Sequence, residues 1–242
     1  MLQQAVTFQA DQRGLEFVPG PRRGQPNRSG ITNIGIIGSG IVAQTLASGF
    51  TRHGHAVMLG TRDAARLDEF AARTPGVRIG SSAEAAAFGE LVVLAVKGGA
   101  ALQAAGDAGA GLDGKPVLDT TNPIADAPPV DGVLPYFTTA QESLMEGLQQ
   151  AHPKARFVKA FNSVGAARMV EPEFEGGRPT MFIAGNEASA KAAATALLDQ
   201  LGWDAADMGS AVAARAIEPL GMLWCIPGFR ENSWTHAFKL LR

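Results

Sequence analysis

Cysteine is almost absent from this chain of 242 residues, which contains Cys225 alone. A single cysteine cannot form an internal disulfide, so a small fold held together by disulfides is excluded. No cluster of Cys and His with the spacing of a zinc site is present either, and we expect no bound metal. These features favour the reducing cytoplasm as the compartment.

Long apolar runs and an excess of one charge are also missing. The longest clean apolar run, residues 91–96, is far shorter than the roughly 20 residues that span a bilayer, so we expect no contact with a membrane. Lys and Arg number 21 against 23 Asp and Glu, for a formal net charge of -2. Without a basic surplus, we expect no nucleic-acid partner.

The chain is organised around residues 32–62. An apolar segment runs directly into the hexapeptide GSGIVA at residues 38–43, and a helical pattern and a second apolar segment follow. Gly38 permits a tight turn, Gly40 removes the Cβ that would hold the backbone away from a pyrophosphate, and Ala43 keeps the helix close to the sheet. This strand, turn, helix and strand predict a dinucleotide site with the phosphates on the free N–H groups of the helix start.

The end of the second apolar segment indicates which dinucleotide binds. Sites for NAD normally place Asp or Glu about 20 residues after the glycines, where it accepts hydrogen bonds from the ribose. This chain instead has Thr61 and Arg62, with Arg66 one helical turn later. A hydroxyl and two guanidinium groups can donate to a 2′-phosphate, which a carboxylate would repel. We therefore expect NADP, and we expect the neighbouring Asp63 to begin the next helix.

Strand-like and helix-like segments alternate along the rest of the chain and predict a doubly wound α/β fold with a mostly parallel sheet. We expect a flexible leader over residues 1–30, one NADP-binding Rossmann domain over residues 31–208 and a helical, aromatic-rich C-terminal extension over residues 209–242. The uninterrupted apolar run at residues 91–96 is typical of a parallel strand covered on both faces, and it should lie beside the first strand.

Ligands of such sheets bind outside the carboxyl ends of the strands. By position alone, the site candidates are Lys97, Thr121, Asn122, Phe161 and Asn162. A long Pro-rich loop over residues 124–137 follows the strand expected at residues 115–119 and precedes a helix expected at residues 142–150, and loops of that length in a compact domain are often functional.

No acid or base stands out for catalysis. Lys97 and Lys159 lie near strand ends, where either side chain would point into the site or into solvent. His53 and His55 fall in the turn before the second strand, away from the site, and read as surface residues. Tyr136, the only tyrosine, is a lid residue or a core residue. The lack of an evident acid or base is compatible with a conjugated ring, such as a flavin or deazaflavin, as the hydride acceptor. It is equally compatible with a protein that binds NADP as a sensor and catalyses no reaction.

Six segments together carry a family likeness: IGIIGSGIVAQTLASGF, GTRD, VVLAVKG, DTTNP, VKAFNSV and EPLGMLW. They resemble the NADP oxidoreductases dependent on the deazaflavin coenzyme F420, a group that is itself similar to the cytosolic reductase domain of the STEAP metalloreductases. The resemblance implies hydride transfer between nicotinamide and a deazaflavin or flavin, in an enzyme that is often a homodimer. It implies contacts to the cofactor from Gly38, Ser39, Gly40, Ile41, Val42, Thr61, Arg62, Arg66, Ala95, Val96, Lys97, Asn122, Pro123, Ala160, Phe161 and Asn162.

The leading hypothesis is therefore an NADP(H)-dependent oxidoreductase with F420 or a flavin as its small-molecule redox acceptor. The alternatives are an NADPH-dependent reductase of a small imine or carbonyl compound and a non-catalytic NADP sensor. Enzymes of the first alternative usually add a large helical dimerisation domain, for which the residues after Ala211 are too few. Trp224, Phe229 and Trp234 are expected to wall the acceptor pocket or a dimer seam, or else simply to pack a C-terminal helix.

Overall fold

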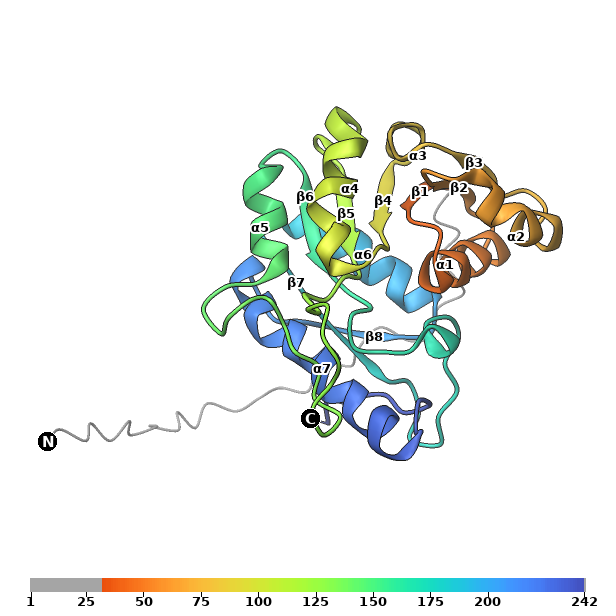
Figure 1. The fold of residues 1–242 in the computed structure, drawn as a ribbon. Helices are drawn as coiled ribbons and strands as arrows, with labels where there is room; N and C mark the ends of the chain where they lie inside the picture. The colour runs from red at the N-terminus through yellow and green to blue at the C-terminus, as the bar shows by residue number, and fades with distance from the viewer. Residues whose placement is uncertain (1–31, 242) are drawn as a thin grey trace, which may run out of the picture. The chain divides into compact units, whose positions relative to one another are not determined.

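The computed structural model describes residues 32–241, and the predicted leader at residues 1–30 lies outside the described residues. Within them, eight strands form one sheet in the order β3-β2-β1-β4-β5-β6-β7-β8 (Figure 1). The strands are β1 (Asn33–Ile37), β2 (Ala56–Gly60), β3 (Arg78–Gly80), β4 (Leu91–Leu94), β5 (Pro116–Asp119), β6 (Arg156–Lys159), β7 (Thr180–Gly185) and β8 (Asp204–Asp207). The α-helices are α1 (Ile41–Arg52), α2 (Asp68–Arg73), α3 (Ser82–Phe88), α4 (Ala101–Ala108), α5 (Leu144–Ala151), α6 (Ala188–Gln200) and α7 (Ala214–Glu231).

Strands β1 to β6 are all parallel, and their spatial order 3-2-1-4-5-6 is that of the doubly wound dinucleotide-binding fold. Strand β7 pairs antiparallel to β6, and β8 pairs parallel to β7. The predicted fold class, a mostly parallel doubly wound sheet, is confirmed. The strand predicted at residues 91–96 is β4, which lies beside β1 as expected, with Ile34 opposite Leu91. The order of the chain reverses between these two strands, and ligands of such folds generally bind outside the carboxyl ends of the strands at this point.

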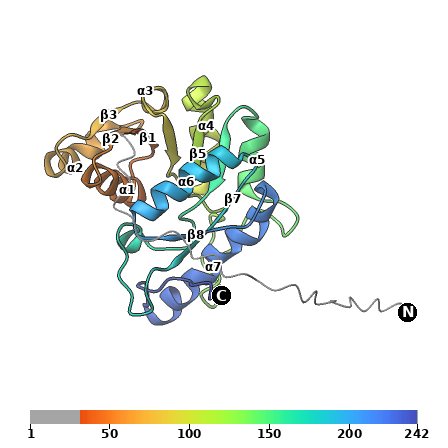
Figure 2. The same ribbon diagram turned by 180° about the vertical axis from the view of Figure 1, so that it is seen from behind.

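Helices cover both faces of the sheet and bury two apolar clusters. One cluster joins α1, α2 and α6 to the sheet and contains Phe50, Leu59 and Trp203. The other joins α3, α4 and α5 to the opposite face and contains Leu94, Leu148 and Phe157. Figure 1 shows α4 and α5 in front of the strands, and Figure 2, from behind, shows α6 crossing in front of them. A strand covered on both faces needs no alternation of polar residues, which explains the continuous apolar run of β4.

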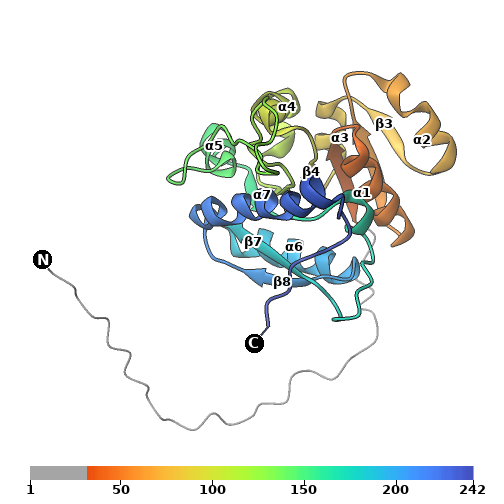
Figure 3. The same cartoon turned by 60° about the horizontal axis from the view of Figure 1, so that its bottom comes forward.

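Helix α7 lies alongside β7 and ends earlier than predicted (Figure 3). The C-terminal extension was expected to be helical to residue 242, but residues 232–241 form neither helix nor strand. Asn232 adopts a left-handed conformation with φ of 53° and stops the helix. The segment then folds back along α7, where Trp224 Nε1 donates to the His236 carbonyl at 2.8 Å.

The three C-terminal aromatic residues pack α7 against this returning segment. The ring of Trp234 lies so close to Gly228 that a Cβ there would be 2.3 Å from it, and Phe229 meets the same ring edge to face. Trp224 is buried and stacks on His236. Packing of a C-terminal helix, the simplest of the sequence-based alternatives, therefore accounts for the contacts of these side chains. Within residues 32–241, no helix combines the length and the apolar character needed to cross a membrane.

Candidate functional site

The turns that follow five parallel strands form one continuous edge. Backbone hydrogen bonds join each turn to its neighbour along the sheet, so the predicted site segments lie next to one another in space. These bonds run from Gly38 N to Gly60 O (2.9 Å), Ala95 N to Ile37 O (2.9 Å), Thr120 N to Leu94 O (3.2 Å) and Ala160 N to Asp119 O (3.1 Å). The order along this edge is the end of β2, the glycine turn after β1, and then the ends of β4, β5 and β6.

The two glycines of the turn after β1 differ in backbone conformation and in the space around the missing side chain. Gly38 has φ of +136°, and a Cβ there would lie 2.1 Å from the carbonyl oxygen of Ala95, so the fold itself requires the absence of a side chain. Gly40 has φ of -77°, and a Cβ there would meet no described atom within 4 Å. The fold gives no packing reason for glycine at position 40. The open space above it suits the close approach of a pyrophosphate.

The start of α1 has the properties of an anion site. Gly40 provides no side-chain cap, and the first turn of α1 contains no acidic residue, so the positive end of the helix is not neutralised. The turn is held in place by the side chain of Gln44, whose Nε2 donates to the Ser39 carbonyl at 2.9 Å. Ile41, the first helical residue, is 68% exposed beside this turn. Free backbone N–H groups at such a helix start can donate to phosphate oxygens.

The predicted 2′-phosphate residues lie in the turn after β2. The Thr61 hydroxyl accepts from Asp63 N at 3.2 Å and donates to the Asp63 carbonyl at 3.1 Å, which orders the turn. Arg62 and Arg66 are exposed, and neither guanidinium has a hydrogen bond or an ion pair with any residue of the part that the structure describes. Asp63 does not engage them and precedes the short 3₁₀-helix η1 (Ala64–Leu67), as expected. Both cations therefore remain available to an anionic ligand.

At the other end of the edge, two asparagines join the turns after β5 and β6. Asn122 Nδ2 donates to the Asn162 carbonyl at 2.7 Å, and Asn162 Nδ2 donates to Asn122 Oδ1 at 3.2 Å and to the Ile217 carbonyl at 2.8 Å. Gly221 of α7 faces this pair, since a Cβ there would be 2.6 Å from Asn122 Nδ2. Helix α7 is thereby part of the wall of the edge.

The remaining predicted contacts divide by exposure. Lys97 is exposed at the end of β4 and precedes the 3₁₀-helix η2 (Gly98–Ala100), and Val96 beside it is half-buried. The side chains of Pro123, Ala160 and Phe161 are buried, so these residues can reach a cofactor only through their backbones. Phe161 packs edge to face against Trp203, and its φ of 60° is unusual for a residue other than glycine.

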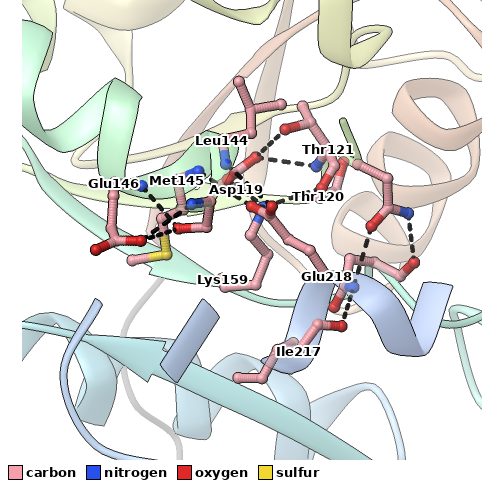
Figure 4. Close-up of polar contacts among 12 residues, drawn as sticks. Asp119, Thr120, Thr121, Leu144, Met145, Glu146, Lys159, Ile217 and Glu218 are labelled. Carbon is pink, nitrogen blue, oxygen red and sulfur yellow. Dashed lines mark hydrogen bonds and ion pairs between the residues drawn. The ribbon is translucent and has the colours of Figure 1, made fainter. Parts of the chain in front are cut away.

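Beneath the two asparagine turns lies a buried cluster of three charged side chains, drawn in Figure 4. Lys159 Nζ, at the end of β6, is 2.6 Å from Asp119 Oδ2 at the end of β5 and 2.9 Å from Glu218 Oε1 on α7. The ammonium also donates to the Thr121 carbonyl at 2.9 Å. Lys159 is completely buried. Both alternatives considered from the sequence, a side chain in solvent and one open to substrate, are wrong for this residue.

Asp119 and Glu218 were not identified from the sequence. The available signal was an acid and a lysine, each ending an apolar strand, but Glu218 is far away in the chain and only tertiary packing brings it to Lys159. Burial disfavours the charged ammonium, yet the carboxylates of Asp119 and Glu218 outweigh it and raise the pKa of Lys159 above its ordinary value. Lys159 thus stays protonated at neutral pH and cannot act as a base.

Tyr136 is neither a free lid residue nor a core residue. It is partly exposed and lines a cavity of about 160 Å³ together with Arg215, Pro219 and Met222. Its hydroxyl donates to the backbone carbonyl of Glu218 at 3.0 Å. Burial, with smaller contributions from Cys225 and Glu218, raises the pKa of Tyr136 well above its usual value, so the phenol keeps its proton.

The histidines before β2 differ from the sequence-based expectation in one respect. His55 is buried, packs against Phe50 and is hydrogen-bonded to Gln200 Oε1 at 2.8 Å, so it is not a surface residue. His53 is partly exposed and lies 3.2 Å from Glu171. Both precede β2 and lie away from the carboxyl edge, as expected. Among the described residues, no group of three or more His, Cys, Asp or Glu side chains is arranged to hold a metal ion.

Comparison with known proteins places these motifs in a family. The family model described as NADP oxidoreductase, coenzyme F420-dependent, matches residues 33–123, which include the glycine turn and the DTTNP segment. A crystal structure of a chain from Arthrobacter sp. FB24, provisionally assigned as an F420-dependent NADP reductase, is 32% identical with a TM-score of 0.82. The match covers 88% of the present chain and 100% of the Arthrobacter chain.

Two further proteins are similar over most of the chain. The metalloreductase STEAP3 of Rattus norvegicus is 28% identical over 201 residues, which cover 80% of the present chain but only 38% of STEAP3. The chain therefore spans well under half the length of that curated relative. A reductive aminase from Aspergillus terreus, solved in complex with NADPH, has a TM-score of 0.60 over 83% of the present chain and 63% of its own. At 18% identity, this second likeness shows the fold alone.

Proposed function

Because the chain belongs to the family of coenzyme F420-dependent NADP oxidoreductases, as its motifs predicted, we propose that it transfers a hydride between NADP(H) and a deazaflavin or flavin ring. Membership of this family makes the chain an NADP-dependent oxidoreductase, and both predictions, of the family and of an enzyme, are confirmed. The identity of the acceptor and the residues that bind the cofactor belong to the proposal.

The fit of the cofactor to the carboxyl edge is the observation that carries the proposal. The open space above Gly40 and the uncapped start of α1 suit the pyrophosphate, while the unpartnered Arg62 and Arg66 suit the 2′-phosphate. The nicotinamide half then extends over the ends of β4, β5 and β6. We propose that the cofactor contacts are those inferred from the motifs: Gly38, Ser39, Gly40, Ile41, Val42, Thr61, Arg62, Arg66, Ala95, Val96, Lys97, Asn122, Pro123, Ala160, Phe161 and Asn162.

Each group at this edge has a definite task. Bound NADPH supplies the hydride. The N–H groups of α1 and the two arginines hold its phosphates, and the asparagine pair provides a rigid floor at the nicotinamide end because its amides are already hydrogen-bonded to each other and to Ile217. Rigid positioning is the main contribution that a protein makes to hydride transfer between two rings.

Two observations support a deazaflavin or flavin as the acceptor. The Arthrobacter chain, provisionally assigned as an F420-dependent reductase, is matched over its whole length. In addition, the polar side chains in the turns after β5 and β6, Thr120, Thr121, Asn122, Asn162 and Ser163, do not titrate, and the titratable Asp119 and Lys159 at the strand ends are held in a buried ion pair. A ring that takes up hydride needs no protein proton donor, whereas reduction of a carbonyl group does.

An acceptor panel tests the proposal. Oxidation of NADPH would be followed with F420, FMN, FAD and a set of imines and carbonyl compounds, each at the same enzyme concentration. We expect turnover with F420 or a flavin and background rates with the imines and carbonyl compounds. Turnover with the imines or carbonyl compounds alone would overturn the proposal and show that the protein is a reductase of small imine or carbonyl substrates. Tight binding of NADPH without turnover of any acceptor would favour a sensor.

A further inference from the structure

The buried charges of Asp119, Lys159 and Glu218, here called the charge cluster and drawn in Figure 4, lie next to the turns that we propose for the nicotinamide end. Asp119 and Lys159 are the last residues of β5 and β6, immediately before the turns that carry Asn122 and Asn162. The exposed fractions of the three side chains are 0% for Lys159 and Asp119 and 2% for Glu218. Charges so far from water are weakly screened and act over longer distances than surface charges.

The hydrogen bonds of the charge cluster indicate that both acids are ionised. Asp119 Oδ1 accepts from the backbone N–H of Thr121 at 2.9 Å and from its hydroxyl at 2.7 Å. Glu218 accepts from the N–H groups of Leu144 and Met145, both at 3.0 Å. Every described partner of these carboxylates is a donor, which is the environment of a carboxylate and not of a carboxylic acid.

One ammonium against two carboxylates leaves the charge cluster with a formal charge of one negative unit. The start of α5 faces Glu218, and its partial positive charge, about half a unit, offsets this only in part. The nearby Arg215 is paired with Glu146 at 2.7 Å. Within residues 32–241, no second cation forms an ion pair with Asp119 or Glu218. The charge cluster is therefore a buried negative charge.

We propose that this charge cluster stabilises the oxidised nicotinamide electrostatically and so favours release of hydride from NADPH. The inference rests on the proposed function. Transfer of a hydride, a proton with two electrons, from NADPH to the deazaflavin or flavin ring leaves a positive charge on the nicotinamide that the reduced ring lacks. A fixed negative charge beneath the ring attracts that charge as it forms and costs no reorganisation, because Asp119 and Glu218 are already held in place.

The test compares the two redox forms of the cofactor in neutral, nearly isosteric variants. Dissociation constants for NADP+ and NADPH would be measured calorimetrically for the wild type, Asp119→Asn and Glu218→Gln. A unit charge about 10 Å from another, in an effective dielectric of about 20, changes an equilibrium constant on the order of tenfold. We therefore expect the ratio of the Kd of NADP+ to that of NADPH to rise about tenfold in each variant. If the charge cluster had a purely structural role, the two substitutions would weaken the binding of NADP+ and of NADPH equally and leave the ratio unchanged.

Glu146→Gln is the matched control. It removes the same charge from the first turn of α5, at a partly exposed site where Arg215 already pairs with the carboxylate. The ratio should stay at its wild-type value in this variant. An unchanged ratio in folded Asp119→Asn and Glu218→Gln would overturn the inference and leave the proposed function intact, whereas failure of the wild type to bind either cofactor form would count against the proposed function itself.

If neither variant folds, Lys159→Met is the second test, because loss of the ammonium makes the charge cluster more negative. The ratio of the Kd of NADP+ to that of NADPH should then fall below the wild-type value. A ratio that does not fall in folded Lys159→Met would overturn the inference. The measurement uses the full chain and needs no acceptor, so the outcome does not depend on whether F420 or a flavin is the redox partner.

Discussion

At the scale of single residues, Arg62 is the side chain to which we assign the choice of NADP over NAD. It lies exposed after β2, and its replacement breaks no hydrogen bond or ion pair of the described residues. We expect Arg62→Ala to weaken NADPH binding by about 1.5 to 3 kcal/mol, the value of a charge-assisted contact to phosphate, and to leave NADH nearly unaffected. Titration calorimetry with both cofactors measures the difference.

Arg73→Ala is the control for that variant. Arg73 is also exposed, but it lies at the end of α2 and donates to the Glu69 carbonyl at 3.2 Å. Its removal changes the net charge by the same amount away from the carboxyl edge, so the preference for NADPH should persist. An equal loss of NADPH and NADH affinity in Arg62→Ala would contradict the assignment of the 2′-phosphate.

Lys159 is the residue whose loss should cost the most stability. Lys159→Met leaves the carboxylates of Asp119 and Glu218 buried without their counter-charge, and removal of one partner of a buried ion pair typically costs about 3 to 5 kcal/mol. Urea unfolding monitored by circular dichroism would measure the loss. Lys154→Met, at a lysine whose side chain is 77% exposed beside Asp113, should change the free energy of unfolding by less than about 1 kcal/mol. Equal stability of the two variants would show that the charge cluster is not needed for folding.

The ion pairs of Lys159 also predict a dependence of stability on pH. The folded-state pKa of Lys159 is raised above its ordinary value of 10.5, so its contribution to stability is complete below that pH. It is lost only as the pH rises through the raised pKa. The stability difference between the wild type and Lys159→Met should therefore stay constant around neutral pH and shrink in strongly alkaline solution.

At the scale of elements, the turn between β1 and α1 contains one glycine that the fold requires and one that we propose is required for binding the cofactor. Gly38→Ala places a methyl group against the Ala95 carbonyl at a positive φ, and we expect a loss of about 2 kcal/mol of stability or more. Gly40→Ala meets open space, so stability should change by less than about 1 kcal/mol while NADPH affinity falls. Thermal unfolding and cofactor titration of both variants test this. Unchanged NADPH binding in Gly40→Ala would argue against a pyrophosphate at the start of α1.

The sequence predicted elements where local chemistry decides structure. The apolar run at residues 91–96 contains β4, and Gly38 marks the turn after β1. The C-terminal segment was predicted wrongly because its conformation depends on distant partners, such as the bond from Thr180 N to the Phe238 carbonyl. The helical spacing of aromatic residues in this segment does not indicate whether such distant contacts form.

At the scale of the whole molecule, the candidate site belongs to the sheet edge and to no single motif. The residues that we propose for the adenosine half could be chosen from the sequence, because Gly40, Thr61 and Arg62 follow one another within a short strand, helix and strand. The wall that we propose for the nicotinamide half could be foreseen only in part, because Asn122 and Asn162 meet through a tertiary hydrogen bond and α7 packs against them. The charge cluster joins residues from β5, β6 and α7, and no local pattern predicts three such partners.

The arrangement of the edge leads to the central claim, direct hydride transfer from a nicotinamide to a deazaflavin or flavin ring. The most direct measurement uses NADPH carrying deuterium at both hydrogens of the reacting nicotinamide carbon. The enzyme would be mixed with this cofactor and F420, and in parallel with FMN and FAD, and each reduced acceptor would be examined for the label. Because bound N–H groups of flavins exchange with water, F420, which takes up hydride at carbon, is the decisive acceptor. Direct hydride transfer predicts one deuterium in the reduced F420 ring, and reduced F420 that carries only solvent hydrogen would contradict it.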